Sequence, residues 1–209
     1  PQTAGRPGLR GAALSLEATE RGGQARLAIA DGAVVFPGVF EQPELPLDSA
    51  QADLVWTLAP GAGGMPPAVV LEVRDAQAAN ADVALRFDGR WRTGDAPGFG
   101  VGQYLPGALA LQGQILRGSA ARVARYLPLG VAPEARAYVA RAFTEGRITG
   151  GDVAVDGDLW RFPFVDGGPG TFRIRAQVEG VRYAFVPSEP GWTSPWPALA
   201  AVKGTLEFD

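Results

Sequence analysis

The residues that could do chemistry in this chain are carboxylates, hydroxyls and arginines, because its 209 residues include no histidine and no cysteine. Without histidine, the chain lacks the commonest general base, the usual zinc ligand and every Ser-His or Cys-His nucleophile. Without cysteine, it forms no disulfide and no thiolate metal site, which is compatible with cytoplasm or periplasm. None of its serines lies in a nucleophile-elbow motif. We therefore expect no enzyme activity and no cofactor.

The densest group of carboxylates is a run of aspartates. Oxygen-rich clusters bind calcium, and the spacing D-x-x-x-D-G-D resembles such a loop, but the run lacks the twelve-residue spacing and the terminal bidentate glutamate. Aspartate beside glycine is typical of turns, so the sequence favours turn-forming side chains at strand ends over a bound metal. Nothing marks two carboxylates as the pair that a glycosidase needs. The run comprises Asp152, Asp156, Asp158 and Asp166.

Two glycine-rich runs, residues 61–67 and 98–102, suggest phosphate-binding loops. The first has no Lys-Ser/Thr after it and runs into two prolines, and the second precedes no helical pattern, so neither offers a helix N-terminus to an anion. The chain has 19 basic and 22 acidic residues, a net charge of −3. This balance indicates neither a nucleic acid nor an anionic membrane surface as a partner.

Aromatic and cationic side chains give two further candidate contacts. Trp192 and Trp196 lie in the Pro-rich run 187–197 and are expected to be exposed, where they could contact carbohydrate or peptide. Trp56 keeps strand register with two leucines and is expected in the core. Arg173 and Arg175 share the polar face of a predicted strand, where we expect them to be solvated, with contact to a lipid headgroup as the alternative.

The elements that must position these residues are mostly strands. Apolar and polar residues alternate with a two-residue period over most of the chain, so each predicted strand is apolar on one face only. Residues 37–49 contain three prolines and are predicted as a loop or edge segment rather than a central strand. Strands are predicted within residues 12–19, 25–30, 53–58, 69–73, 83–87, 109–115, 153–155, 172–185 and 202–208.

Apolar residues repeat at helical spacing only in residues 119–145. Ser119 is the expected cap of a short helix that ends before Pro128. A second helix is predicted from Pro133 to Glu145, with Gly146 as its left-handed C-cap. Its apolar stripe either packs on the sheet as a structural cover or acts as a lid over it. The stripe includes Tyr138, Val139 and Phe143.

Two architectures can accommodate strands that are apolar on one face. A sandwich or barrel buries these faces against one another, whereas a long curved sheet leaves an internal groove. Alternation alone favours the sandwich or barrel, because it is the commoner arrangement. No apolar run approaches 18 residues, so neither a transmembrane helix nor a signal peptide is predicted in this piece.

Several motifs in the second half of the chain together resemble a known family. They are R-Y-L-P-L-G at 125–130, P-E-A-R-A-Y at 133–138, R-A-F-x-x-G-R-I-x-x-G at 141–151, V-x-G-D-L-W-R-F-P-F at 155–164, G-x-F-R-I-R-A at 170–176 and G-T-L-E-F at 204–208. Their combination resembles the YhdP-type members of the AsmA-like family, which are very long bacterial envelope proteins anchored in the inner membrane. The resemblance is good from about Leu109 to Val186 and generic before that.

The resemblance implies both a fold and a function. The fold is mainly β: a curved antiparallel meander that forms an apolar groove, with a short two-helix insertion at about 119–145. The implied function is non-enzymatic phospholipid transport between the two membranes, in the periplasm, which supports the outer-membrane barrier. Acyl chains would lie along the apolar face and headgroups at its wet edge. The expected lining residues are Leu54, Trp56, Leu71, Val73, Leu85, Phe87, Leu109, Leu111, Ile115, Phe172, Ile174, Tyr183 and Phe185.

The expected organisation is a single β-rich segment of a longer protein. It comprises a flexible lead at 1–10, a β-meander at 11–117, the helical insertion at 118–146 and a second meander at 147–209. Neighbouring segments of the same chain are expected partners, together with phospholipid acyl chains. Two alternatives remain open: a structural or protein-interaction module of a large periplasmic scaffold, which uses exposed strand edges, and a carbohydrate-binding β-sandwich.

Overall fold

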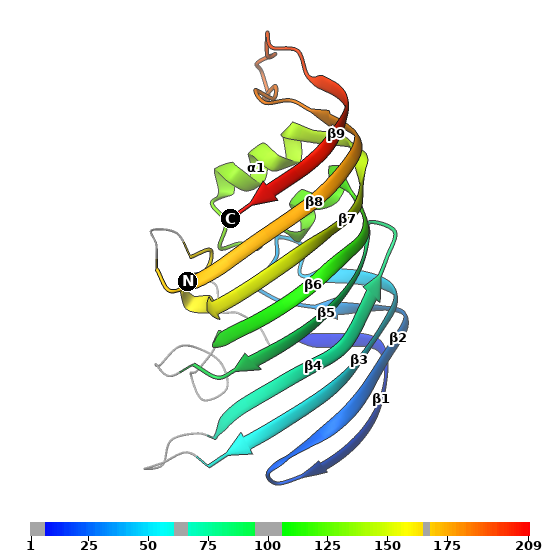
Figure 1. Cartoon of the computed structure of the whole chain (residues 1–209), viewed down its shortest axis with the longest axis vertical. Helices are drawn as coiled ribbons and strands as arrows, with labels where there is room; N and C mark the ends of the chain where they lie inside the picture. The colour runs from blue at the N-terminus through cyan, green and yellow to red at the C-terminus, as the bar shows by residue number, and fades with distance from the viewer. Residues whose placement is uncertain (1–6, 61–66, 95–105, 165–167) are drawn as a thin grey trace.

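One curved, open sheet of nine antiparallel strands forms the molecule (Figure 1). The computed structural model describes residues 7–60, 67–94, 106–164 and 168–209. Each strand pairs with the next strand in sequence, so the sheet is a simple meander. The described residues contain no second sheet, so the predicted groove fold is confirmed and the sandwich is excluded. The strands are β1 (Gly8–Thr19), β2 (Gly22–Val35), β3 (Glu44–Ala59), β4 (Ala68–Ala79), β5 (Val83–Arg92), β6 (Ala108–Ser119), β7 (Phe143–Asp158), β8 (Gly170–Tyr183) and β9 (Leu199–Phe208).

Strand β3 starts earlier than the sequence predicted. Residues 37–49 were expected in a loop or an edge segment because of their three prolines, and residues 44–49 pair with β2 alone at first, with Pro46 opposite Ala33. Pairing between β3 and β4 begins only at Ser49. The first residues of β3 therefore form a local edge of the sheet, where a proline without an N–H costs no ladder hydrogen bond. The glycine-rich runs predicted as loops at 61–67 and 98–102 lie almost wholly outside the described residues.

Two helices interrupt the meander between β6 and β7: the 3-10 helix η3 (Ala120–Tyr126) and the α-helix α1 (Pro133–Ala142). The prediction that the second helix runs to Glu145 is wrong, because Phe143 already begins β7. Gly146 lies within β7 at φ 108° rather than at the helix C-cap. Ser119 precedes η3 as predicted, but its side chain makes no capping hydrogen bond.

The helical insertion packs on the sheet around Phe143. The ring of Phe143 stacks on that of Tyr183 with centroids 5.0 Å apart, and this packing outweighs the continued helical spacing in the sequence. Val139 and Tyr138 of α1 pack against the same cluster. The Tyr138 and Tyr183 hydroxyls form a hydrogen bond of 2.9 Å. The buried part of the cluster comprises Ala120, Ala142, Phe143, Ile148, Ala176, Val178 and Val181.

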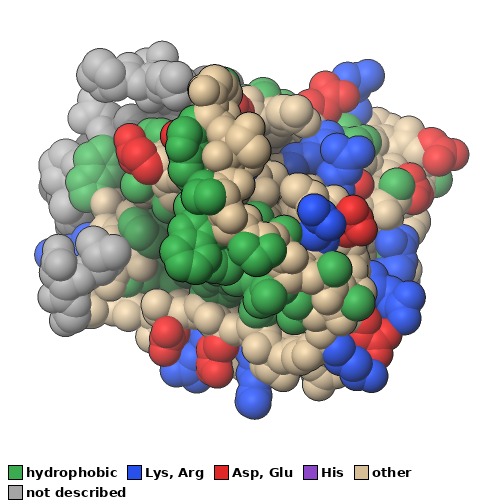
Figure 2. Space-filling model, turned by 90° about the horizontal axis from the view of Figure 1, so that it is seen from above, with side chains coloured by type: hydrophobic (Ala, Val, Ile, Leu, Met, Phe, Trp, Pro, Cys, Tyr) green, Lys and Arg blue, Asp and Glu red, His purple; other side chains and the backbone are tan. Residues whose placement is uncertain are grey.

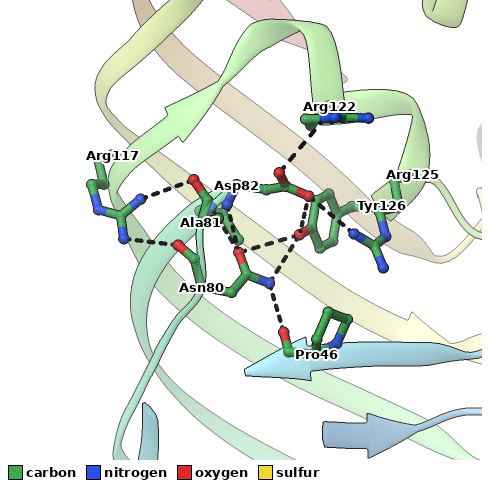
Figure 3. Close-up of polar contacts among 9 residues, drawn as sticks. Pro46, Asn80, Ala81, Asp82, Arg117, Arg122, Arg125 and Tyr126 are labelled. Atoms are coloured by element: carbon green, nitrogen blue, oxygen red, sulfur yellow. Dashed lines mark hydrogen bonds and ion pairs between the residues drawn. The ribbon is translucent and has the colours of Figure 1, made fainter. Parts of the chain in front are cut away.

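A polar network around Asn80 fixes the other side of the insertion to the β4–β5 turn (Figure 3). The Asn80 side chain is buried, and its amide nitrogen donates to the Pro46 carbonyl at 2.8 Å and to the Tyr126 hydroxyl at 3.1 Å. The Asp82 carboxylate accepts hydrogen bonds from Tyr126 and Arg125, both at 3.2 Å. Burial raises the pKa of Tyr126 above its usual value, which keeps its hydroxyl protonated as a donor. The network thus joins β3, the β4–β5 turn and η3.

Close backbone approach explains why a glycine interrupts the apolar face at position 113. A Cβ atom on Gly113 would lie 2.8 Å from both the Arg86 carbonyl oxygen and the Phe87 Cβ. Real Cβ atoms essentially never approach so closely, so this position needs a glycine where β5 and β6 pair. Gly204 in β9 is different, because nothing lies within 4 Å of a Cβ placed there.

Gly113→Ala should therefore destabilise the domain, whereas Gly204→Ala should not. We expect the first change to lower the free energy of unfolding by about 1–3 kcal/mol, the usual range for overpacking, and the second to change it by less than about 0.5 kcal/mol. Urea denaturation followed by circular dichroism measures both values. Equal effects of the two substitutions would contradict the role given to close approach at Gly113.

The hydroxyl pair in the insertion predicts a response to alkaline pH. The hydrogen bond to Tyr183 and burial raise the pKa of Tyr138 from 10.0 to about 12. The neutral hydroxyl is therefore favoured by folding, and its contribution to stability is complete below pH 10 and lost as the pH rises from 10 to 12. Tyr138→Phe should lower the melting temperature at pH 8. Between pH 10 and 12, the melting temperature of this variant should decrease less than that of the wild type. If the melting temperatures of both proteins decrease equally between pH 10 and 12, the hydroxyl pair does not contribute to stability.

Candidate functional site: the apolar face of the sheet

One face of the sheet is apolar along complete rows of paired residues. Residues paired directly across antiparallel strands point to the same side, so each row can be followed through the register. One row crosses all nine strands through Ala12, Ile29, Ala50, Ala78, Leu85, Ile115, Gly151, Ala176 and Leu206. Another crosses eight strands through Leu16, Ala25, Leu54, Val73, Gly89, Leu111, Val155 and Phe172.

The large side chains in the middle of this face are half-buried rather than buried. Leu54, Phe87, Leu111 and Phe172 all belong to this class. One cluster of fully buried residues lies under the helical insertion, and other buried residues, including Ile29, Leu45 and Leu47, lie on β2 and β3. Figure 2 shows hydrophobic side chains gathered in a hollow, with most charged side chains around the outside. Apolar side chains that the fold leaves accessible to solvent form the floor of an open groove, which we call the apolar groove.

Most of the predicted lining residues lie on this face. Tyr183 belongs to the cluster under the helical insertion, and Phe185 lies beyond the end of β8, where it packs edge-to-face on Trp196 with centroids 5.5 Å apart. The predicted residues in the apolar rows are Leu54, Trp56, Leu71, Val73, Leu85, Phe87, Leu109, Leu111, Ile115, Phe172 and Ile174.

The sequence analysis missed other residues on the same face. Val153 and Val155 continue the rows on β7, and Trp91 pairs with Leu71 and Leu109. The two valines keep the same two-residue alternation, which could have identified them. Trp91 continues the two-residue alternation of Gly89, but the Gly/Pro-rich run just after it makes the end of the strand hard to locate from the sequence.

The helical insertion bounds the apolar groove. The N–H of Leu129, in the linker between η3 and α1, donates to the Val39 carbonyl of the β2–β3 connection at 2.8 Å. Gly130 lies against the Phe162 ring, which follows the short 3-10 helix η4 (Leu159–Arg161). Phe162 in turn packs edge-to-face on Phe172, with centroids 5.1 Å apart. One linker thus contacts connections that are far apart in the sequence.

The opposite face of the sheet is polar and neutralises many of its charges locally. Glu179 accepts from Lys203 at 2.8 Å and from Arg147 at 2.6 Å. These two hydrogen bonds and the charges of their donors hold the pKa of the Glu179 carboxyl below its usual value. Arg26 pairs with Asp53 at 2.9 Å on the same face. The face therefore stays ionised and solvated at neutral pH.

Other predicted positions lie away from the apolar groove. Trp192 and Trp196 are exposed, as expected. Asp152, Asp156 and Asp158 alternate along β7 on the polar face, and Asp158 accepts the N–H of Trp160 at 3.0 Å, as a turn-forming aspartate does. Asp166 lies outside the described residues. Among the residues that the structure describes, no group of acidic side chains could hold a metal ion, and no helix is long and apolar enough to cross a membrane.

Comparison with known proteins gives a family match. A family model described as YhdP protein matches residues 2–209, almost the whole chain. No curated protein and no solved structure matches the chain significantly. The family match agrees with the motifs in the second half of the sequence and extends the resemblance to the first half.

Proposed function

The chain belongs to the YhdP family, a family of bacterial envelope proteins of the lipid-transfer type, and we propose that its apolar groove shields phospholipid acyl chains from water. The observation that carries this proposal is the complete apolar row that stays half-buried across the middle of the sheet. Monomeric proteins rarely leave contiguous apolar surface of this kind without a ligand or partner. An acyl chain is the ligand class that needs no polar group in the groove.

The energetics suit a carrier rather than an enzyme. Each methylene group removed from water contributes roughly 0.8 kcal/mol, so even partial burial of two acyl chains stabilises a bound lipid. No side chain in the apolar rows carries a charge that would have to be desolvated. Binding along such a surface is non-directional, so lipids can slide along it, and we assign no catalytic residue to the groove.

The proposed setting is the periplasm, where a lipid must cross water between the inner and outer membranes. In this setting the chain would act as one segment of a longer conduit, and its work would support the barrier of the outer membrane. Headgroups would remain at the open, wet edge of the sheet while acyl chains follow the apolar rows. The lining residues of the sequence analysis, with Val153, Val155 and Trp91 added, are the proposed contacts.

A second candidate function is a protein-interaction module. Strands β1 and β9 are the two edges of the described sheet, and each has one side without a strand partner. Leu14 and Leu16 on β1 are about half exposed, at 51% and 54%. Neighbouring segments of the same protein could add strands there. This function is compatible with lipid shielding, because added strands would lengthen the same apolar face.

Native mass spectrometry of the purified segment tests the proposal. We expect co-purified phospholipid at near-stoichiometric level, and we expect Leu111→Asp to reduce it at least tenfold, because the carboxylate would have to be desolvated beneath an acyl chain. The matched control is Gln112→Asp, the next residue on the same strand, which faces the polar side. Gly89→Phe provides a second test without added charge, because a Cβ there meets only ordinary contacts of 3.6 Å and more and the ring would occupy the groove.

The folded state of each variant must be checked by its melting temperature. Lipid lost from Leu111→Asp and Gly89→Phe but kept by Gln112→Asp, with all three proteins folded, would support the apolar groove. A folded wild-type segment that binds no lipid, even when mixed with phospholipid vesicles, would contradict the proposal and leave the interaction module as the function.

A further inference from the structure

The connection between β8 and β9, residues 184–198, carries exposed aromatic side chains at one end of the molecule. It extends beyond the sheet at the top of Figure 1. Trp192 and Trp196 are 48% and 59% exposed, and Phe185 and Leu199, at the two ends of the connection, are 40% and 51% exposed. Large apolar side chains that gather on one exposed segment mark an interaction site more often than single exposed residues do.

Internal contacts fix the conformation of this connection, so its tryptophans are exposed by a defined structure. The Trp192 N–H donates to the Glu189 carbonyl at 2.9 Å, and the Glu189 N–H donates to the Trp192 carbonyl at 3.0 Å. Between them, Gly191 takes φ 81°, the left-handed value that a type II turn needs after a proline. Arg141 of α1 donates to the Glu189 carboxylate at 2.9 Å. The turn that presents Trp192 is therefore held against the helical insertion.

The backbone of the connection offers few free N–H groups. Four of the residues 187–197 are prolines, which have no N–H. The Ser194 N–H donates to the Ser188 hydroxyl at 3.0 Å, and the Trp196 N–H donates to the Ser194 hydroxyl at 3.2 Å. Because a free N–H is costly to remove from water, a segment with most of its donors used or missing can enter an apolar environment at low cost.

The charges of the connection indicate which partner suits it. Glu189 is the only charged side chain in residues 184–202, and its ion pair with Arg141 neutralises it. Attraction to an anionic membrane surface needs basic residues, which this stretch lacks. A carbohydrate site needs polar side chains beside the stacking ring, but two of the three hydroxyl side chains in the connection already serve its own backbone. An uncharged surface with exposed tryptophans suits the boundary between headgroups and acyl chains, where the amphipathic indole ring is favoured.

We propose that the β8–β9 connection is a membrane-docking site that inserts Trp192 and Trp196 into the interfacial region of a lipid bilayer. This inference goes beyond the proposed function, because docking needs no lipid in the apolar groove. The connection is joined to α1 by hydrogen bonds from the Tyr138 hydroxyl to the Phe185 carbonyl at 3.2 Å and from the Ala184 N–H to the Ala142 carbonyl at 2.9 Å. A docked bilayer would therefore lie beside the helical insertion, which bounds the apolar groove.

Flotation of the purified protein with phosphatidylcholine vesicles tests the docking site. We expect the wild type to bind, with no gain from added phosphatidylglycerol and no loss at high salt, because the contact is not electrostatic. Trp192→Ala should weaken binding about tenfold, the order expected when one large apolar side chain is no longer removed from water. The turn uses the backbone of residue 192, so alanine preserves it. Trp192→Ala combined with Trp196→Ala should weaken binding further.

Two control variants locate the contact, and a melting temperature shows that each variant is folded. Trp160→Ala removes a tryptophan that is 63% exposed and lies after β7, at the opposite end of β8 from the connection, so it should leave vesicle binding unchanged. Leu111→Asp, which should lose co-purified phospholipid, should still bind vesicles as strongly as the wild type. The docking site and the proposed function can therefore fail separately.

Docking that Trp192→Ala weakens and both controls retain would support the proposal. It would be overturned if the folded wild type binds no vesicles, or if the wild type and Trp192→Ala bind equally, and the exposed tryptophans would then be assigned to a protein partner. Binding that requires phosphatidylglycerol and disappears at high salt would assign the contact to basic residues outside the connection and overturn the proposal. Loss of vesicle binding in Leu111→Asp would overturn it as well, because the apolar groove would then hold the vesicle.

Discussion

Strand register is the constraint on which this molecule depends. A slip of one residue between two strands would turn the apolar side chains of one strand to the polar face, and a meander of nine strands offers many places for such a slip. Bulges absorb the extra residues instead. At the bulge in β4, Asp75 takes φ 50°, and its N–H donates to the Asp88 carboxylate at 2.9 Å. A side chain of the polar face thereby helps to keep the apolar rows continuous.

The apolar face of the sheet is covered in one region and open in another. Where the helical insertion covers β7, β8 and β9, the apolar side chains are buried in an ordinary core. In the middle of the sheet, the same alternation leaves large side chains such as Leu54, Phe87 and Leu111 half-buried. The closed region supplies much of the packing that stabilises the domain, so the open region can keep an accessible apolar surface. The Asn80 network then fixes the insertion relative to the β4–β5 turn through oriented hydrogen bonds.

Much of the fold could be predicted from the sequence because alternation and helical spacing are local signals. The strands, the one-sided apolar face and the position of the insertion follow from these signals. Alternation could not decide between a sandwich and a groove, because it shows which side chains share a face but not what covers that face; the family motifs were needed. The end of α1 was missed because Phe143 packs on Tyr183, a residue 40 positions later. The start of β3 was missed because Pro46 lies where the neighbouring strand has already ended.

The candidate site was predictable in outline for the same reason. Most of the lining residues follow from the alternation along each strand, whereas the rows that they form depend on which strands are neighbours and on their register. Leu54, Leu111 and Phe172 are far apart in the sequence, and nothing local indicates that they share a row. A site made by pairing across strands becomes visible only when the register is known.

The order of the strands also bears on how the chain reaches this structure. Because every strand pairs with its predecessor, each new strand meets an edge that is already formed, and the chain can add strands in the order in which it is synthesised. Such nearest-neighbour topologies close short loops and avoid the entropic cost of distant pairing. The hydrogen bond between Leu129 and Val39 joins distant parts of the chain, so it can form only after the strands between them have been synthesised. Strands can therefore pair one after another in sequence order. The helical insertion can dock on the strands before and after it only once β7, β8 and β9 have been synthesised.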